Sequence, residues 1–168
     1  MEDNVEKCEV THFRRRNGGI DYFLNGKMLR KSEAQRDLGV LVQDSLKVNV
    51  QVQSAVRKAN AMLAFMSRGL EYKSRDVLLM LYKALVKPHL EYCEQFWAPY
   101  LRKDVLALER VQRRFTRMIP GLKSLLYEER LRTLGLYSLE FRRMRGILLK
   151  LTGYCEAWIE WTCRGCFH

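Results

Sequence analysis

Acidic residues are scarce relative to basic ones in this sequence of 168 residues. It contains 30 Lys and Arg against 19 Asp and Glu, which gives a formal net charge of +11. A charge of this size attracts polyanions, with nucleic acid as the first class of partner and an anionic membrane surface as the second. It carries no information about the fold.

Long apolar runs and a secretory leader are also lacking. No run of 18 apolar residues occurs, so we expect no membrane-spanning helix and no membrane partner. Met1-Glu2-Asp3 is acidic where a secretory signal is basic and then apolar. The 5 cysteines form an odd set, which favours free thiols over a disulfide framework. These features predict an intracellular protein, in the nucleus or the cytoplasm.

An Asp-Asp pair is missing, and this bears on polymerase chemistry. Nucleotidyl transfer uses two divalent ions about 3.5–4 Å apart, held by carboxylates on a rigid backbone. The adjacent acids here are Glu2-Asp3 and Glu128-Glu129. The second pair falls in the first turn of an expected helix, where carboxylates complement the helix dipole. We therefore expect no catalytic residues, no metal site and no cofactor.

Hydrophobic residues make up 48% of the chain, enough for a core. Residues 6–42 favour short strands, because apolar and polar residues alternate from Cys8 onward and Asn25-Gly26 is typical of a hairpin turn. The apolar run at 38–42 predicts a third strand. We expect these strands to form one small antiparallel sheet.

From about residue 45 to 120 the apolar spacing becomes helical. One helix is expected to stop at Gly69, and a second, capped by Ser74, is expected to kink or break at Pro88. Further helices are expected over 104–119, over 127–134 before Gly135, and from Ser138 to about 151. The predicted fold is α+β and mainly α, a small antiparallel sheet followed by a helical bundle.

Composition divides the chain into a strand region at 1–43, a helical bundle at 44–151 and a Cys/Trp-rich tail at 152–168. The tail contains Cys163-Arg164-Gly165-Cys166, with His168 and Cys155 nearby. These four side chains could supply zinc ligands, but their spacing matches no common zinc motif. Free thiols are the preferred interpretation, and we predict no metal there.

Arginines recur along one face of the helix expected over 104–119. They fall at positions 0, 3, 4 and 7, and are Arg110, Arg113, Arg114 and Arg117. The opposite face is apolar and contains Leu108, Val111, Phe115, Met118 and Ile119. A second basic group lies on the last predicted helix and consists of Arg142, Arg143 and Arg145. Guanidinium groups suit bidentate phosphate contacts, so both groups are candidate nucleic-acid-binding sites; the alternative is an ordinary solvated helix face.

Four aromatic residues lie on or beside the apolar face of the second predicted helix. They are Tyr82, Tyr92, Phe96 and Trp97. Aromatic residues in such positions pack into cores more often than they stack on bases. We therefore predict that all four are core residues.

Several motifs follow one another in collinear order between residues 4 and 149. They are Asn4 to Val10, Tyr22-Phe23-Leu24-Asn25-Gly26, Arg36-Asp37-Leu38-Gly39-Val40, Leu81 to Tyr92 with Phe96-Trp97, Leu108 to Arg114 with Met118-Ile119-Pro120, and Tyr127 to Leu131. In this order the chain resembles the reverse transcriptases of LINE-type non-LTR retrotransposons, in particular the jockey-like and chicken-repeat-like group. The resemblance implies the end of a palm at 6–42 and a helical thumb from 45 onward. The usual task of that thumb is to grip the primer–template duplex.

Two departures from the family qualify this expectation. The family's metal-binding motif, an aromatic residue followed by Ala-Asp-Asp, would lie before the point where this chain begins. After Arg145-Gly146 the family continues with an acidic residue, where this chain has Ile147-Leu148. The resemblance thus implies a fragment of an RNA-directed DNA polymerase without its active site. It would bind RNA or an RNA–DNA duplex without regard to sequence, through its basic helices.

Two alternatives remain open at the level of sequence. The helices could serve as a scaffold for a protein partner, since a thumb without its palm contacts exposes apolar surface. The chain could also be a retroelement relic without a function. The sequence gives no indication of the oligomeric state.

Overall fold

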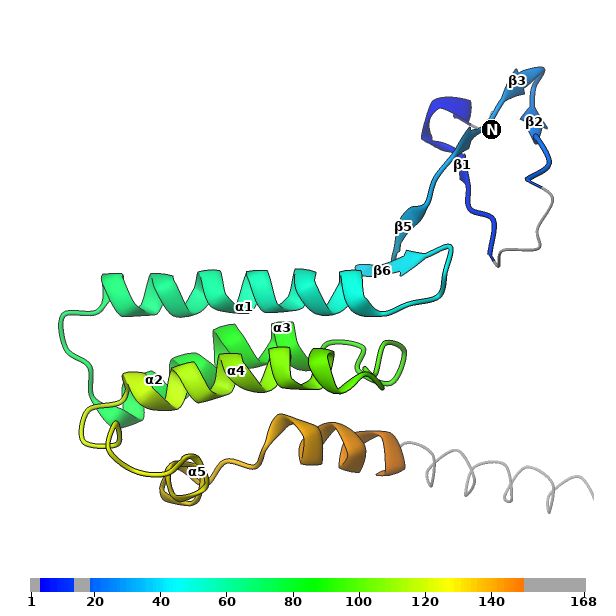
Figure 1. The fold of residues 1–168 in the computed structure, drawn as a ribbon. Helices are drawn as coiled ribbons and strands as arrows, with labels where there is room; N and C mark the ends of the chain where they lie inside the picture. Colours follow the sequence, from blue (N-terminus) through cyan, green and yellow to red (C-terminus); the bar gives the residue numbers. More distant parts are fainter. Residues whose placement is uncertain (1–3, 14–18, 150–168) are drawn as a thin grey trace, which may run out of the picture.

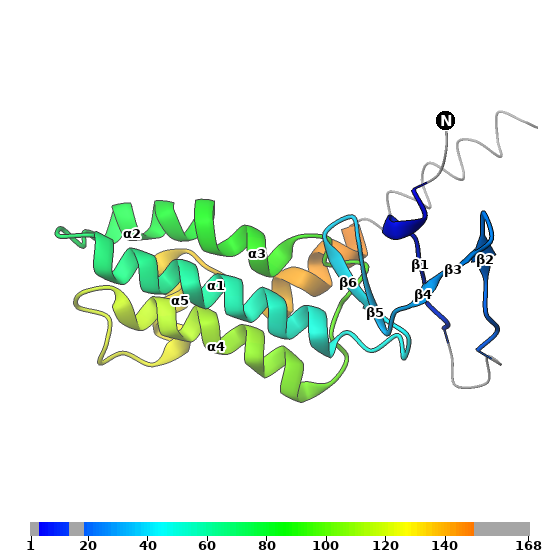
Figure 2. The same cartoon turned by 90° about the horizontal axis from the view of Figure 1, so that it is seen from above.

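A computed structural model describes residues 4–13 and 19–149 of the chain. It consists of a body of helices and a strand region that projects from one end of this body (Figures 1 and 2). The order of elements, short strands first and helices afterwards, confirms the predicted α+β, mainly α fold class.

The strands pair as three separate two-stranded sheets. Their bounds are β1 Glu9–Val10, β2 Phe23–Leu24, β3 Lys27–Met28, β4 Arg30–Lys31, β5 Ala34–Asp37 and β6 Val40–Gln43. The pairs β2–β3 and β5–β6 are antiparallel, whereas β1–β4 is parallel. The prediction of one antiparallel sheet was therefore wrong in this respect. Val40 is the only strand residue among those described that is buried, so the strands share no apolar face that could join them.

Two tight turns connect the antiparallel pairs. Asn25-Gly26, with φ of 52° and 75°, forms the predicted hairpin turn. Leu38-Gly39, with φ of 43° and 84°, forms a second one, so the third predicted strand begins at Val40. The Tyr92 hydroxyl donates a hydrogen bond to the Leu38 carbonyl at 2.9 Å, which fastens this hairpin to the helical body.

The helices follow the predicted limits closely. Their bounds are α1 Asn49–Gly69, α2 Arg75–Leu81, α3 Lys87–Glu91, α4 Arg102–Met118 and α5 Tyr127–Leu134, followed by a helix at 139–149. Ser74 caps α2 by accepting the Val77 N–H at 3.3 Å, as predicted. Gly135 ends α5 in the left-handed conformation with φ of 61°, and Ser138 accepts the Phe141 N–H at 3.3 Å at the start of the last helix.

Pro88 is accommodated by a widened turn. The segment Tyr82–Val86 is a π-helix, and the Lys87 N–H bonds to the Tyr82 carbonyl, five residues back. Pro88 follows directly in the first turn of α3, so the widened turn accommodates its missing N–H within a helical stretch that is continuous from Arg75 to Glu91. The predicted kink or break thus takes the form of a π-bulge.

The core lies between α1, α4 and the segment from α2 to α3. Leu63 from α1, Leu78 from α2 and Phe115 from α4 are each at most 1% exposed. The rings of Tyr82 and Phe115 stack with centroids 4.0 Å apart at the centre of this core.

The prediction for the aromatic residues is half confirmed. Tyr82 and Trp97 are each 1% exposed, but Tyr92 is 56% and Phe96 is 62% exposed. The prediction assumed that the helix continues through these positions. In fact α3 ends at Glu91 and the backbone turns away, so the apolar spacing no longer points to the core.

Two further expectations concern thiols and membranes. Of the five cysteines, Cys8 and Cys93 lie in the described part of the chain and both are free thiols. The zinc alternative falls on 152–168, outside the described residues. Over the described ranges, no helix is long and apolar enough to cross a bilayer.

Candidate nucleic-acid interface

The helix α4 presents the predicted arginine row to solvent. Arg110, Arg113, Arg114 and Arg117 are all exposed. On the opposite side Leu108, Val111, Phe115 and Ile119 are at most 1% exposed. Met118 is partly buried and packs against this core. The two faces of α4 are therefore arranged as the spacing predicted. Within 4–13 and 19–149, none of the four arginines forms an ion pair.

The acidic residues of α4 are buried and do not lie on this surface. Asp104 and Glu109 are each 7% exposed, although both belong to a helix rich in exposed charge. Every exposed charged residue of α4 is basic, namely Arg102, Lys103, Arg110, Arg113, Arg114 and Arg117. Of these, Arg102 pairs with Glu140 at 3.2 Å. Lys103 extends the arginine row by two turns, and the arginine spacing by itself did not indicate it.

The neighbouring helix α1 adds further positive charge. It contains no acid, and its exposed charged residues are Arg57, Lys58 and Arg68. A shallow groove of about 260 Å³ lies between α1 and α4 and is lined by Asn60, Arg110 and Arg114 among others. The Arg114 guanidinium reaches across it to the Asn60 amide oxygen at 3.5 Å.

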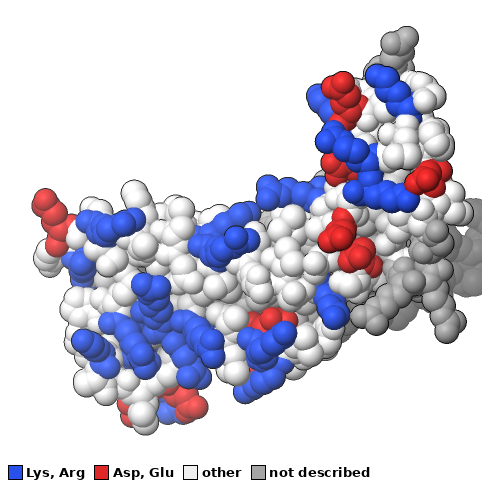
Figure 3. Space-filling model, turned by 45° about the horizontal axis from the view of Figure 1, so that its top comes forward, with Lys and Arg blue, Asp and Glu red and all other residues white. Residues whose placement is uncertain are grey.

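We call Lys103, Arg110, Arg113, Arg114 and Arg117 of α4, together with Arg57 and Arg68 of α1, the basic face. Figure 3 shows that Lys and Arg atoms gather over the helical body, with few Asp or Glu atoms among them. The packing of α1 on α4 joins two helices that lie far apart in the sequence. The sequence did not predict that basic residues of α1 lie beside those of α4, because it does not show which helices pack together.

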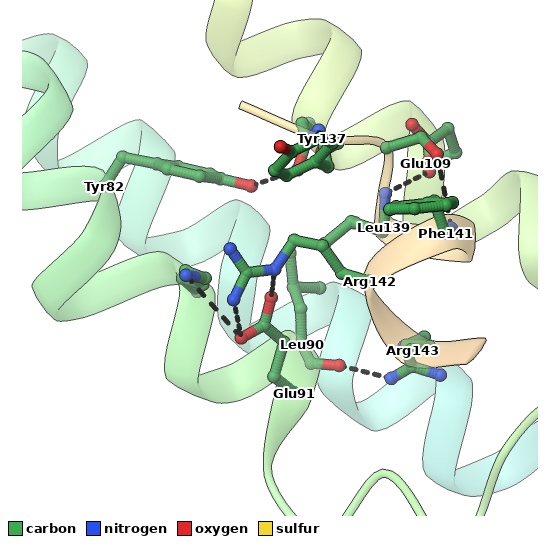
Figure 4. A network of polar contacts seen from close by, with 12 residues as sticks. Tyr82, Leu90, Glu91, Glu109, Tyr137, Leu139, Phe141, Arg142 and Arg143 are labelled. Atoms are coloured by element: carbon green, nitrogen blue, oxygen red, sulfur yellow. Dashed lines mark hydrogen bonds and ion pairs between the residues drawn. The ribbon is translucent and has the colours of Figure 1, made fainter. Parts of the chain in front are cut away.

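The second predicted group does not form one exposed patch. Arg142 pairs with Glu91 of α3 at 2.9 Å between Nε and Oε1 (Figure 4). Arg143 is 5% exposed, lies with its Cζ 4.2 Å above the Trp97 ring and donates to the Leu90 carbonyl. Burial lowers the pKa of Arg143 to about 10, against the opposing effect of nearby carboxylates. Arg145 alone of the three is exposed.

A buried polar network fixes α4 against the elements that follow it. The Glu109 carboxylate accepts a hydrogen bond from the Tyr127 hydroxyl. It also accepts one from the Leu139 N–H at 3.0 Å (Figure 4). The Tyr82 hydroxyl donates to Gln112 Oε1 at 2.8 Å, and Gln112 Nε2 donates to the Tyr127 oxygen at 3.2 Å. Burial raises the pKa of both tyrosines above their usual range. The network holds Glu109 inward, so its charge does not offset the basic face.

Of the adjacent acids Glu128 and Glu129, Glu129 caps the helix as the sequence indicated. Both lie in the first turn of α5, and Glu129 Oε2 accepts the Leu126 N–H at 3.0 Å. In the part of the chain that the structure describes, no three His, Cys, Asp or Glu side chains gather into a group that could hold a metal ion.

Comparison with known proteins gives no match: none to a protein-family model, none to a curated protein and none to a solved structure. Any inference about function therefore depends on this chain's own residues. The feature of these residues that bears on it is the geometry of the basic face.

Proposed function

We propose that this chain binds the phosphate backbone of RNA or an RNA–DNA duplex, without regard to sequence, through its basic face. We further propose that it is a fragment of a LINE-type RNA-directed DNA polymerase that does not itself polymerise. The observation that carries the proposal is the separation of charge on α4. Its acids are buried, and its exposed charged residues are all basic.

The dimensions of α4 suit a polynucleotide backbone. At about 1.5 Å per residue, Lys103 and Arg117 lie about 21 Å apart along the helix axis. Each strand of a duplex carries one phosphate per about 3.4 Å along the duplex axis. A helix of this length laid parallel to that axis therefore covers the rise of about six phosphates of one strand. Guanidinium groups spaced along such a length bind successive phosphates and read no bases, which predicts affinity without sequence preference.

The test is a binding titration by fluorescence anisotropy with an RNA–DNA duplex of about 20 base pairs, between about 50 and 200 mM salt. We expect log K to fall linearly with log salt, because bound phosphates release counterions. Duplexes of unrelated sequence should bind equally. A flat dependence on salt would refute phosphate-driven binding.

A matched pair of variants locates the interface. Arg110→Gln/Arg114→Gln removes two charges from the basic face, and Lys27→Gln/Arg36→Gln removes two exposed charges from the strand region. The first variant should reduce the salt slope by about 2, one for each lost phosphate contact, and the second should leave it unchanged. Equal losses in the two variants would show general electrostatic attraction and would contradict an interface on α4.

The proposed lack of polymerase activity rests on the sequence, which contains no pair of adjacent aspartates. Two-metal nucleotidyl transfer needs a fixed cluster of carboxylates. Primer extension by the purified chain with Mg²⁺ should give no product. Template-dependent nucleotide addition would overturn this part of the proposal.

A second candidate function is a scaffold for a protein partner, favoured by exposed apolar residues of the last helix. Phe141 is 53% and Met144 is 61% exposed. Met144 also lines an apolar pocket of about 320 Å³ together with Tyr100 and Val105. Exposed apolar patches mark interaction surfaces. Sedimentation that shows a monomer with no tendency to associate would count against this function.

A further inference from the structure

Three arginines and one tyrosine meet where the end of α4 approaches α5. Arg113 lies with its Cζ 4.6 Å from the centroid of the Tyr127 ring, and the Cζ of Arg130 lies 5.5 Å from the same centroid. Arg130 Nη1 also donates to the Arg113 carbonyl at 3.4 Å. Arg117 is one turn further along the exposed side of α4, and its charge acts on Arg130.

Among the residues that the structure describes, Arg130 is a buried cation without a compensating anion. It is 3% exposed, and its Nε has no hydrogen-bond partner there. Within the described ranges no carboxylate forms an ion pair with Arg130, Arg113 or Arg117. Burial first, and then the charges of Arg117 and Arg113, lower the pKa of Arg130.

Two of the acids near this corner, Glu109 and Glu129, are already engaged in hydrogen bonds. Glu109 accepts from the Tyr127 hydroxyl and the Leu139 N–H, and Glu129 accepts from the N–H of Leu126. Buried charges in proteins are as a rule paired, because an isolated one carries a large desolvation cost. An excess of guanidinium groups with an unsatisfied buried N–H is the arrangement expected of a site that receives its anion from outside.

We propose that Arg113, Arg117 and Arg130 form a subsite for one phosphate group. The Cζ of Arg113 lies over the Tyr127 ring, and a guanidinium group held there can present two parallel N–H groups of its edge to phosphate oxygens. Tyr127 is a positioning residue. The subsite rests on the proposed function, since the phosphate belongs to a nucleic-acid backbone in that case. Free phosphate offers the same oxygen chemistry.

The test compares substitutions that each remove one charge. Arg117→Gln and Arg130→Gln alter the subsite, and Arg132→Gln is the matched control, because Arg132 is an exposed arginine of the same helix as Arg130. Arg117 is exposed, so its variant retains the fold and carries the test if Arg130→Gln does not fold.

The first arm is the duplex titration. Arg117→Gln and Arg130→Gln should each lower the salt slope by about 1, and Arg132→Gln should leave it unchanged. The second arm is thermal unfolding in inorganic phosphate against sodium chloride of equal ionic strength. If free phosphate occupies the subsite, it raises the Tm of the unaltered chain and of Arg132→Gln but not that of the subsite variants.

The two arms separate the sources of the phosphate. An effect in the duplex arm alone supports the subsite with a backbone phosphate as its ligand. An effect in the phosphate arm without any duplex binding supports the subsite and overturns the proposed function. Subsite variants that match Arg132→Gln in both arms overturn the subsite, and duplex binding by the unaltered chain would then leave the proposed function standing.

Discussion

Replacement of Glu109 by alanine tests whether the buried network holds α5 and the last helix on α4. The carboxylate is 7% exposed and accepts from the Tyr127 hydroxyl and the Leu139 N–H. Its removal leaves two donors without an acceptor, at about 1–3 kcal/mol each, so we expect a loss of about 2–6 kcal/mol in the free energy of unfolding. For a chain of this length, at about 2–4 °C per kcal/mol, the Tm should fall by about 4–24 °C.

The matched control is Glu140→Ala. Glu140 also forms a charged contact, with Arg102 at 3.2 Å, but the two side chains are 51% and 71% exposed. Exposed ion pairs contribute about 0–1 kcal/mol, so this variant should be close to the unaltered chain. The assay is denaturant unfolding followed by circular dichroism, together with thermal unfolding.

A double-mutant cycle with Tyr127→Phe isolates the contact between Glu109 and the hydroxyl. We expect a coupling energy of about 1–3 kcal/mol, as for residues that share a hydrogen-bond network. The reasoning is refuted if Glu109→Ala costs no more than Glu140→Ala, or if the cycle shows no coupling.

Two further predictions concern pH and local stability. Stability should fall as the pH rises above about 10, because burial raises the pKa of Tyr82 and Tyr127 in the folded chain while the unfolded chain ionises there. Arg143 acts in the opposite direction, since burial lowers its pKa to about 10 and the cost of its buried charge disappears above that pH. Burial also lowers the pKa of Arg130 and Lys87, but the pKa values of the two tyrosines are shifted further, so their effect should prevail. Denaturant unfolding at a series of alkaline pH values checks this, and stability that is constant or rising would contradict it. Amide hydrogen exchange should be slower in α1 and α4 than in the strands from β1 to β6, where Val40 is the one buried residue of those described; slowest exchange in the strands would contradict it.

Local signals account for the limits of the helices. Gly69 ends α1, Ser74 begins α2 and Gly135 ends α5, as the sequence predicted. Caps and left-handed turns depend on residues within a few positions of each other, so they can be read without knowledge of the tertiary structure. The prediction of a single antiparallel sheet failed for the same reason. The parallel pair β1–β4 joins residues that are distant in the sequence, and local signals do not reveal such a pairing.

Periodicity likewise placed the four arginines of α4 on one face, and the amino-acid composition alone determined the net charge of +11. Tertiary structure decided which charged side chains remain on the surface. Arg143 turns inward onto Trp97, Glu109 meets a hydroxyl 18 residues away, and Arg130 is buried beside Arg113. The reason is physical: a long charged side chain leaves water only where packing supplies a ring, a carbonyl or a counter-charge, and those partners come from other helices.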